Sequence, residues 1–220
     1  MKYAIITGAN GGLGSFVSRK LIEDNYFVIM LYHNKDDEVR KLHELYPNNS
    51  LVYKCDITNE KEVENIKEII TNKGIDIDLL INNAGIDVTG ELVDKNIDTF
   101  MNTYKVNAVG AFFMMKYFGE GIDINRGDII NISSENTLTT YDIVSLEYDM
   151  SKAALNMLTL EFARLYQGAK VNALAPTWMD TPMVDEDIKQ FIECVPLEVV
   201  YENIKRIIES DKTGEIILVK

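Results

Sequence analysis

The chain has 220 residues, of which 46% are apolar, so it can bury one sizeable core, and we expect a single domain over residues 1–220. The apolar run from Met1 to Ile6 is too short for a secretion signal. No run approaches the roughly 20 residues of a membrane-spanning helix, so a cytoplasmic location is expected. The net charge of −13 argues against nucleic acid and anionic membranes as partners.

The chain holds few residues that bind metals or form disulfides. Cys55 and Cys194 are far apart in sequence and predict reduced, buried thiols. The two histidines, His33 and His43, lack a second ligand at metal-like spacing. We therefore expect neither a metal site nor histidine-based catalysis.

Short apolar runs alternate along the chain with amphipathic segments of helical period. The pattern predicts strands over residues 3–7, 27–32, 51–54, 78–82, 128–132, 169–174 and 215–219. It predicts helices over residues 16–25, 36–46, 60–72, 106–118, 148–166 and 198–210. Such alternation is typical of an α/β fold with one doubly wound parallel sheet of about seven strands and helices on both faces. Ligands of such sheets bind at the carboxyl ends of the strands.

A glycine-rich loop follows the first predicted strand. It reads Thr7-Gly8-Ala9-Asn10-Gly11-Gly12-Leu13-Gly14 and precedes a predicted helix. Glycines let the backbone come close to a pyrophosphate, and the helix start offers unpaired N–H groups. The loop therefore favours dinucleotide binding, although glycines also form ordinary strand-to-helix turns.

Further motifs follow in order along the chain: Asp56 after the third strand, Asn82-Asn83-Ala84-Gly85 after the fourth, Asn107, Ser134, Tyr148-x-x-x-Lys152, and Pro176 with Thr181. With the glycine loop, they resemble the short-chain dehydrogenase/reductase family over residues 3 to about 183, and in particular its 3-oxoacyl-carrier-protein reductase-like members. The resemblance implies a Rossmann-type fold and an NAD(P)-dependent oxidoreductase acting on CH–OH groups. It implies cofactor contacts from Gly8, Asn10, Gly12, Leu13, Gly14, Tyr32, His33, Asn34, Asp56, Ile57, Asn83, Ala84, Gly85, Tyr148, Lys152, Pro176 and Thr181.

The same resemblance implies a catalytic set of Asn107, Ser134, Tyr148 and Lys152. Tyr148 and Lys152 are four apart on a predicted helix and share a face. A free tyrosine has a pKa of about 10, and we expect the Lys152 ammonium and the charge of an oxidised nicotinamide to lower it, so that the phenol can act as general acid and base. The resemblance implies that Lys152 also holds the nicotinamide ribose, that Ser134 binds the substrate oxygen, and that Asn107 holds a proton-relaying water.

Each of these residues also has a plain structural interpretation. Tyr and Lys at this spacing are common on helix surfaces, and Ser134 could form a turn. Asn107 could cap a following helix, and Asp56 could be an N-cap or turn residue. Their shared order and spacing make coincidence a poor explanation.

The end of the second strand bears on the choice of nicotinamide cofactor. Relatives that prefer NAD usually carry an acidic residue there, whereas this chain has Tyr32, His33, Asn34 and Lys35 before Asp36. This favours NADP, with NAD as the alternative. His33 to Lys35 could also form only a solvated turn.

The substrate cleft is expected between residues 135–147 and a short lid at about 177–196. Apolar side chains there suit a small or medium carbonyl or alcohol: Leu138, Tyr141, Leu146, Trp178, Met183 and Phe191. Thr177 replaces the family's usual glycine, and the chain lacks the D-G-G tail of the 3-oxoacyl-carrier-protein reductases. That subtype and a catalytically idle dinucleotide sensor remain the alternatives. We expect a homo-oligomer, a dimer or tetramer.

Overall fold

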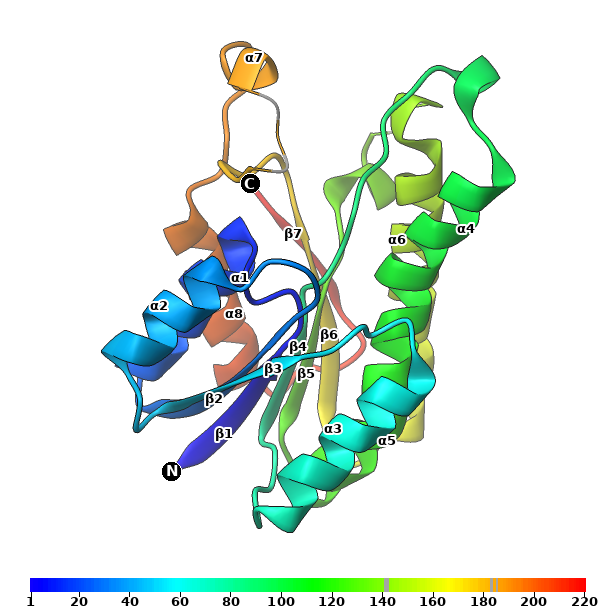
Figure 1. Cartoon of the computed structure of the whole chain (residues 1–220). Helices are drawn as coiled ribbons and strands as arrows, with labels where there is room; N and C mark the ends of the chain where they lie inside the picture. The colour runs from blue at the N-terminus through cyan, green and yellow to red at the C-terminus, as the bar shows by residue number, and fades with distance from the viewer. Residues whose placement is uncertain (141–142, 183, 185) are drawn as a thin grey trace.

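A computed structural model describes residues 1–140, 143–182, 184 and 186–220 of the chain (Figure 1). The strands are β1 (Lys2–Ile6), β2 (Tyr26–Tyr32), β3 (Ser50–Lys54), β4 (Leu79–Asn82), β5 (Asp128–Ile132), β6 (Lys170–Pro176) and β7 (Ile216–Val219). The α-helices are α1 (Gly12–Glu23), α2 (Asp37–Leu45), α3 (Glu60–Asn72), α4 (Ile97–Tyr104), α5 (Gly110–Ile124), α6 (Leu146–Leu165), α7 (Glu186–Lys189) and α8 (Leu197–Glu209).

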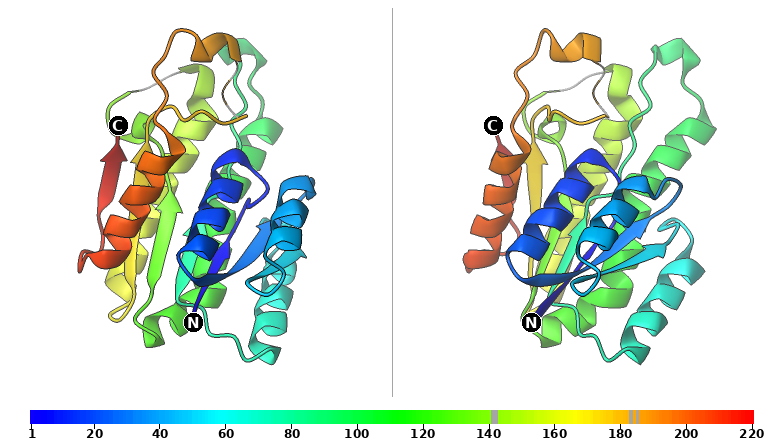
Figure 2. Two further views of the ribbon diagram at one scale, coloured as in Figure 1. Left: turned by 90° about the vertical axis from the view of Figure 1, so that its left-hand side faces the viewer. Right: turned by 60° about the vertical axis from the view of Figure 1, so that its left-hand side comes forward.

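These strands form one seven-stranded sheet, in the order β3-β2-β1-β4-β5-β6-β7, and every pairing is parallel. The predicted α/β Rossmann-type fold is therefore confirmed. The carboxyl ends of all the strands meet at one edge of the sheet (Figure 2). The strand order reverses between β1 and β4, where Ile6 pairs with Ile81. Ligands of doubly wound sheets bind at such a switch point.

Helices cover both faces of the sheet and bury its strands. Helices α1, α2 and α8 pack on one face, and α3, α5 and α6 pack on the other (Figure 1). Every residue of β4 and β5 is buried, so their sequences do not alternate between apolar and polar residues, and Asn82, Asp128 and Asn131 are their only polar members. No helix among the described residues is long and apolar enough to span a membrane.

Buried polar side chains fasten α6 to the centre of the sheet. The Asn82 amide donates to Asn131 Oδ1 at 2.8 Å, and the Asn131 amide donates to Thr159 Oγ1 on α6 at 2.8 Å. These two buried hydrogen bonds link β4, β5 and α6, so they help to specify how α6 lies against the sheet. Tyr148 and Lys152 lie on the same helix.

The structure corrects two predicted helices. The predicted helix over 106–118 is a longer helical run: α4, a π-helical turn at Lys105–Val109, and then α5. Helix α4 went unpredicted because its sequence mixes polar and apolar residues, and its side chains are largely exposed. The predicted helix over 148–166 begins two residues earlier, at Leu146, after a 3-10 turn at Ile143–Ser145.

Candidate functional site

The loops after β1 and β4 are joined at the switch point by side-chain hydrogen bonds. Thr7 Oγ1 accepts from the backbone N–H groups of Asn83 and Ala84, at 3.0 Å each. In return, the Asn83 amide donates to Thr7 O at 2.9 Å and to Gly8 O at 3.1 Å. The N-N-A-G segment therefore holds the glycine loop in place.

Two positions of the glycine loop, Gly8 and Gly14, leave no room for a side chain. Gly8 has a φ of +62°, and a Cβ there would lie 2.8 Å from Ala84 Cα. A Cβ at Gly14 would overlap Gly8 O and lie 2.7 Å from Asn83 Nδ2. Helix α1 starts at Gly12, and its N-cap Gly11 supplies no side-chain bond, so its amino end can receive an anion. The loop fits a dinucleotide pyrophosphate, and Leu13 contributes only backbone there because its side chain is buried in the core.

Asn10 has a structural contact that the sequence did not predict. Its Oδ1 accepts from the backbone N–H groups of Glu38 and Val39, at 2.9 and 3.1 Å, and its amide donates to Asp37. Asp36, at the N-cap position of α2, makes no side-chain cap bond. Asn10 takes that part from the glycine loop and caps the helix.

Arg40 was missed by sequence reasoning and lies beside the end of β2. Its Nε pairs with Asp36 Oδ2 at 2.5 Å, and hydrogen bonding to Asp36, followed by that carboxylate's charge, raises the pKa of Arg40. The Tyr32 side chain also contacts the guanidinium and contributes to the rise. The i, i+4 spacing of Asp36 and Arg40 is the sequence pattern that could have indicated this ion pair.

Asp56 and His33 meet at the carboxyl ends of β2 and β3. His33 Nε2 lies 3.9 Å from Asp56 Oδ2. Asp56 is a turn residue: its Oδ1 accepts from the Thr58 N–H and hydroxyl, at 2.9 and 2.8 Å. The N-cap of α3 is Asn59, so the alternative that Asp56 caps this helix is wrong. Ile57, next along the chain, packs against Gly110.

Tyr148 and Lys152 share one face of α6, as predicted, and project toward the loop after β4. Lys152 Nζ lies 5.5 Å from the centre of the Tyr148 ring and donates to Ile132 O at 2.7 Å. A Cβ on Gly85 would lie 3.2 Å from Lys152 Nζ and 3.4 Å from Asn107 Oδ1. Gly85 thus leaves the space in which Lys152 and Asn107 approach each other.

Ser134 completes the group around the phenol. Its hydroxyl hydrogen-bonds the Tyr148 side chain and thereby acts to lower the pKa of Tyr148. Its Oγ also accepts from Asn136 N at 3.3 Å, so Ser134 is at once a turn residue and a neighbour of the phenol. The four residues of the predicted catalytic set therefore lie together at the carboxyl edge of the sheet.

The expectation that Lys152 lowers the pKa of Tyr148 is wrong for the protein by itself, in which that pKa is raised. Burial raises the pKa of Tyr148 to about 12, and the Asp87 and Asp149 carboxylates add to the rise against the effect of Ser134. Burial lowers the pKa of Lys152 to about 8. Lys152 Nζ donates to Ile132 O, and burial of the phenol is the largest influence on the pKa of Tyr148.

Asn107 braces the segment that follows the N-N-A-G motif. Its Oδ1 accepts from Ile86 N at 2.8 Å, and its Nδ2 donates to Ile86 O at 2.8 Å and to Ser151 Oγ at 2.9 Å. It lies inside the π-helical turn of a continuous helical run, so it is not a helix cap. π-Helical turns inside α-helices are frequent at functional sites.

The predicted lid lies between β6 and α8. The buried side chain of Thr181 faces the start of α1, because a Cβ on Gly12 would lie 3.0 Å from Thr181 Cβ. Pro176, at the end of β6, is buried. Of the expected cleft wall, Trp178 is 42% exposed, but Phe191 is 87% exposed and projects into solvent. Tyr141 and Met183 lie outside the described residues, and Cys194 is half-buried rather than buried.

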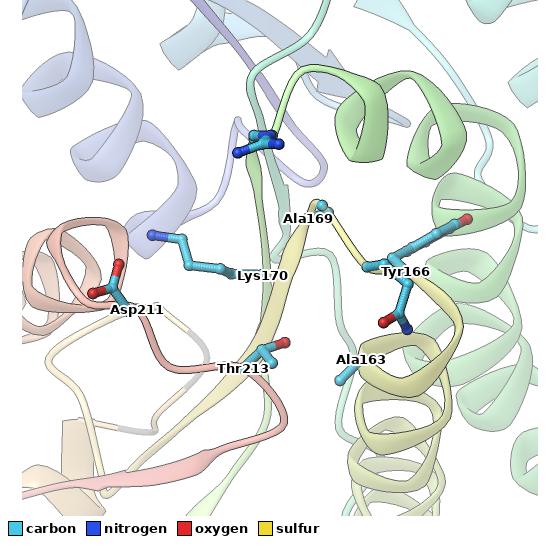
Figure 3. Close-up of a pocket in the computed structure, with 9 residues that line it drawn as sticks. Ala163, Tyr166, Ala169, Lys170, Asp211 and Thr213 are labelled. Atoms are coloured by element: carbon cyan, nitrogen blue, oxygen red, sulfur yellow. The ribbon is translucent and has the colours of Figure 1, made fainter.

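A separate polar pocket of about 420 Å³ lies at the opposite, amino edge of the sheet (Figure 3). Ala163 lies in the last turn of α6, Tyr166 directly follows that helix, and Lys170 begins β6. Lys170 Nζ is already occupied by Ile208 O and Ser210 O, at 2.7 Å each. The pocket is therefore distinct from the group around Tyr148.

Comparisons with known proteins agree with this geometry. The pattern of the family described as short chain dehydrogenase matches residues 2–191. An uncharacterised oxidoreductase of Staphylococcus aureus (strain N315) is 27% identical over 82% of this chain and 79% of its own length. An NAD-dependent glycerol dehydrogenase of Listeria innocua is 28% identical over 87% of this chain and 79% of its own length.

A solved structure described as ElxO with NADP bound superposes with a TM-score of 0.87 and 26% identity, over 99% of this chain and 96% of that one. Its likeness extends over the whole sheet and its helices, and the family match spans the glycine loop, the N-N-A-G segment and α6. The chain belongs to the short-chain dehydrogenase family and is a dinucleotide-dependent oxidoreductase.

Proposed function

We propose that the chain interconverts a carbonyl and an alcohol, with Tyr148 as the general acid and base and NADP(H) as the preferred cofactor. The observation that carries the proposal is the convergence of Ser134, Tyr148 and Lys152 at the carboxyl edge of the sheet. The glycine loop beside them has the shape and the free helix start that a pyrophosphate requires.

A bound nicotinamide supplies the hydride in reduction and accepts it in oxidation. With a pKa of about 12, Tyr148 carries its proton at neutral pH and can donate it to the substrate oxygen as the C=O π bond opens. Ser134 can hydrogen-bond that oxygen and then the phenolate. Lys152, with a pKa of about 8, carries a proton at neutral pH and can return one to the phenolate. These protonation states fit carbonyl reduction.

The cofactor preference rests on the region after β2. His33, Asn34 and Lys35 follow Tyr32 there, and Arg40 adds a second cation beside Tyr32. A 2′-phosphate could pair with these groups. The nearby carboxylates of Asp36 and Asp37 are engaged by Arg40 and by Asn10. NAD(H) is the alternative cofactor, and separate titrations with NADPH and NADH distinguish the two.

We also propose that the chain forms a homo-oligomer, at least a dimer. Helices α4, α5 and α6 expose large apolar side chains, of which Met101 is 41%, Phe112 37% and Met157 57% exposed. Such a set of side chains is typical of an interface. Sedimentation of the protein at increasing concentration tests this, and a monomer throughout would contradict it.

A carbonyl panel of ketones, aldehydes and quinones tests the proposed reaction, with loss of the reduced cofactor as the signal. Tyr148→Phe removes only the reactive hydroxyl, so we expect it to abolish turnover while the reduced cofactor still binds. If Tyr148→Phe retains wild-type turnover, the assigned role is wrong. Cofactor binding with no turnover of any panel member by the wild type favours the idle-sensor alternative instead.

A further inference from the structure

A buried ion pair lies directly beside the residue that carries the proposed acid. Lys95 Nζ pairs with Glu147 Oε2, and the two side chains are only 10% and 1% exposed. Glu147 is the neighbour of Tyr148 in the first turn of α6. Lys95 belongs to the segment after β4, more than fifty residues earlier in the chain. None of the family motifs in the sequence includes Lys95 or Glu147.

Three further bonds join the same two segments. Lys95 Nζ also donates to Val144 O at 2.8 Å, and Gly90 N donates to the same oxygen at 3.1 Å. Ser145 Oγ donates to Asp87 Oδ2 at 3.0 Å. The segment from Asp87 to Lys95 is therefore fastened to the residues that lead into Tyr148. Together with the Lys95–Glu147 ion pair, these bonds make four contacts, and all of them involve the 3-10 turn at Ile143–Ser145 or the start of α6.

The carboxyl group of Asp87 lies at the contact between these two segments and is partly buried. Its Oδ1 is buried and has no hydrogen-bond partner among the described residues, and burial raises the pKa of Asp87. The charged groups that act on Asp87 are Lys95 from its own segment and Glu147 and Asp149 from α6. Asp149 Oδ1 accepts from Asn136 at 2.7 Å. The Asp87 carboxylate in turn acts on Tyr148 and on Lys152.

From this geometry we propose that Lys95 and Asp87 are positioning residues for Tyr148: they fasten the segment after β4 to the first turn of α6 and so fix where the phenol points. The inference rests on the proposed function, in which Tyr148 transfers a proton. Neither residue exchanges a proton with the substrate. Each acts through Glu147 or Ser145, which lie within three residues of Tyr148.

The test compares variants that separate positioning from stability. Lys95→Met leaves the Glu147 carboxylate buried and unpaired, so both thermal stability and kcat should fall, kcat by roughly 10- to 100-fold. The double variant Lys95→Met, Glu147→Met replaces the whole pair with apolar side chains, and its thermal stability should recover. Its kcat should stay low, because the fastening to Val144 is also gone. Lys116→Met, at the exposed Lys116–Glu60 pair, is the matched control and should keep wild-type activity.

Asp87→Asn gives a second readout that a merely structural role would not change. The Asp87 carboxylate raises the pKa of Tyr148, so replacing it with an amide should lower that pKa. In the oxidation direction Tyr148 acts as the base, so the fall in rate on the acidic side of the pH profile should move to lower pH. Cofactor affinity should remain that of the wild type in every variant. A double variant with wild-type kcat, or an unshifted pH profile in Asp87→Asn, would overturn the inference.

The Tyr148→Phe variant keeps the two proposals apart. If Tyr148→Phe is inactive and the Lys95 and Asp87 variants behave as wild type, only the positioning inference fails. If Tyr148→Phe is fully active, the proposed function fails, whatever the other variants show.

Discussion

Replacing Asn107 with alanine should cost both stability and turnover. The Asn107 side chain makes three hydrogen bonds, to Ile86 N, Ile86 O and Ser151 Oγ, at 2.8 to 2.9 Å, and it is 1% exposed. At 0.5–1.5 kcal/mol for each net bond, its loss should lower the free energy of unfolding by about 2–4 kcal/mol. The released segment adjoins Gly85, so kcat should also fall, on the order of 100-fold. Urea unfolding and steady-state kinetics measure the two effects.

Asn172→Ala is the matched control for this substitution. Asn172 is also 1% exposed, and its amide likewise bridges backbone groups: it donates to Lys212 O at 2.8 Å and accepts from Glu215 N at 2.9 Å. It lies near the start of β6, away from Tyr148. We expect a loss of about 1–3 kcal/mol with kcat unchanged. If Asn107→Ala loses stability but keeps the wild-type kcat, as Asn172→Ala is expected to do, the reasoning about Asn107 is refuted.

Two further predictions concern the glycine loop and the buried lysine. Gly14→Ala places a methyl group against Gly8 O and Asn83, so dinucleotide affinity measured by fluorescence titration should drop sharply; wild-type affinity would contradict the fit of this loop. Burial lowers the pKa of Lys152 to about 8 from 10.5, so between these values the unfolded chain holds a proton that the folded chain has released. Folding stability should therefore rise with pH in that window, by at most about 3 kcal/mol, and Lys152→Met should lack the rise in urea unfolding. An identical pH dependence in the two proteins would count against the buried ammonium.

Much of the architecture could be predicted because the sheet is parallel and covered on both faces. Strands such as 27–32 are continuous apolar runs, and amphipathic helices separate the strands. The family motifs also predicted the neighbours of Tyr148, because residues four apart on a helix share a face and strand ends meet at one edge. Their roles in binding and catalysis remain proposals.

The parts that were not predicted depend on contacts between distant segments. The cap that Asn10 provides for α2 joins residues 28 positions apart, and the Lys95–Glu147 pair joins residues 52 positions apart. No local pattern marks either contact. The pKa of Tyr148 was predicted in the wrong direction because burial is the largest influence on it, and burial cannot be read from the spacing of two residues.

Transfer of a labelled hydride tests the central claim most directly. The protein would be incubated with a turned-over carbonyl compound and a reduced nicotinamide that carries deuterium at its transferable position. We predict one deuterium on the carbinol carbon of the product, and none with Tyr148→Phe under the same conditions. Product alcohol without deuterium on that carbon, or equal labelling by Tyr148→Phe, would contradict the account.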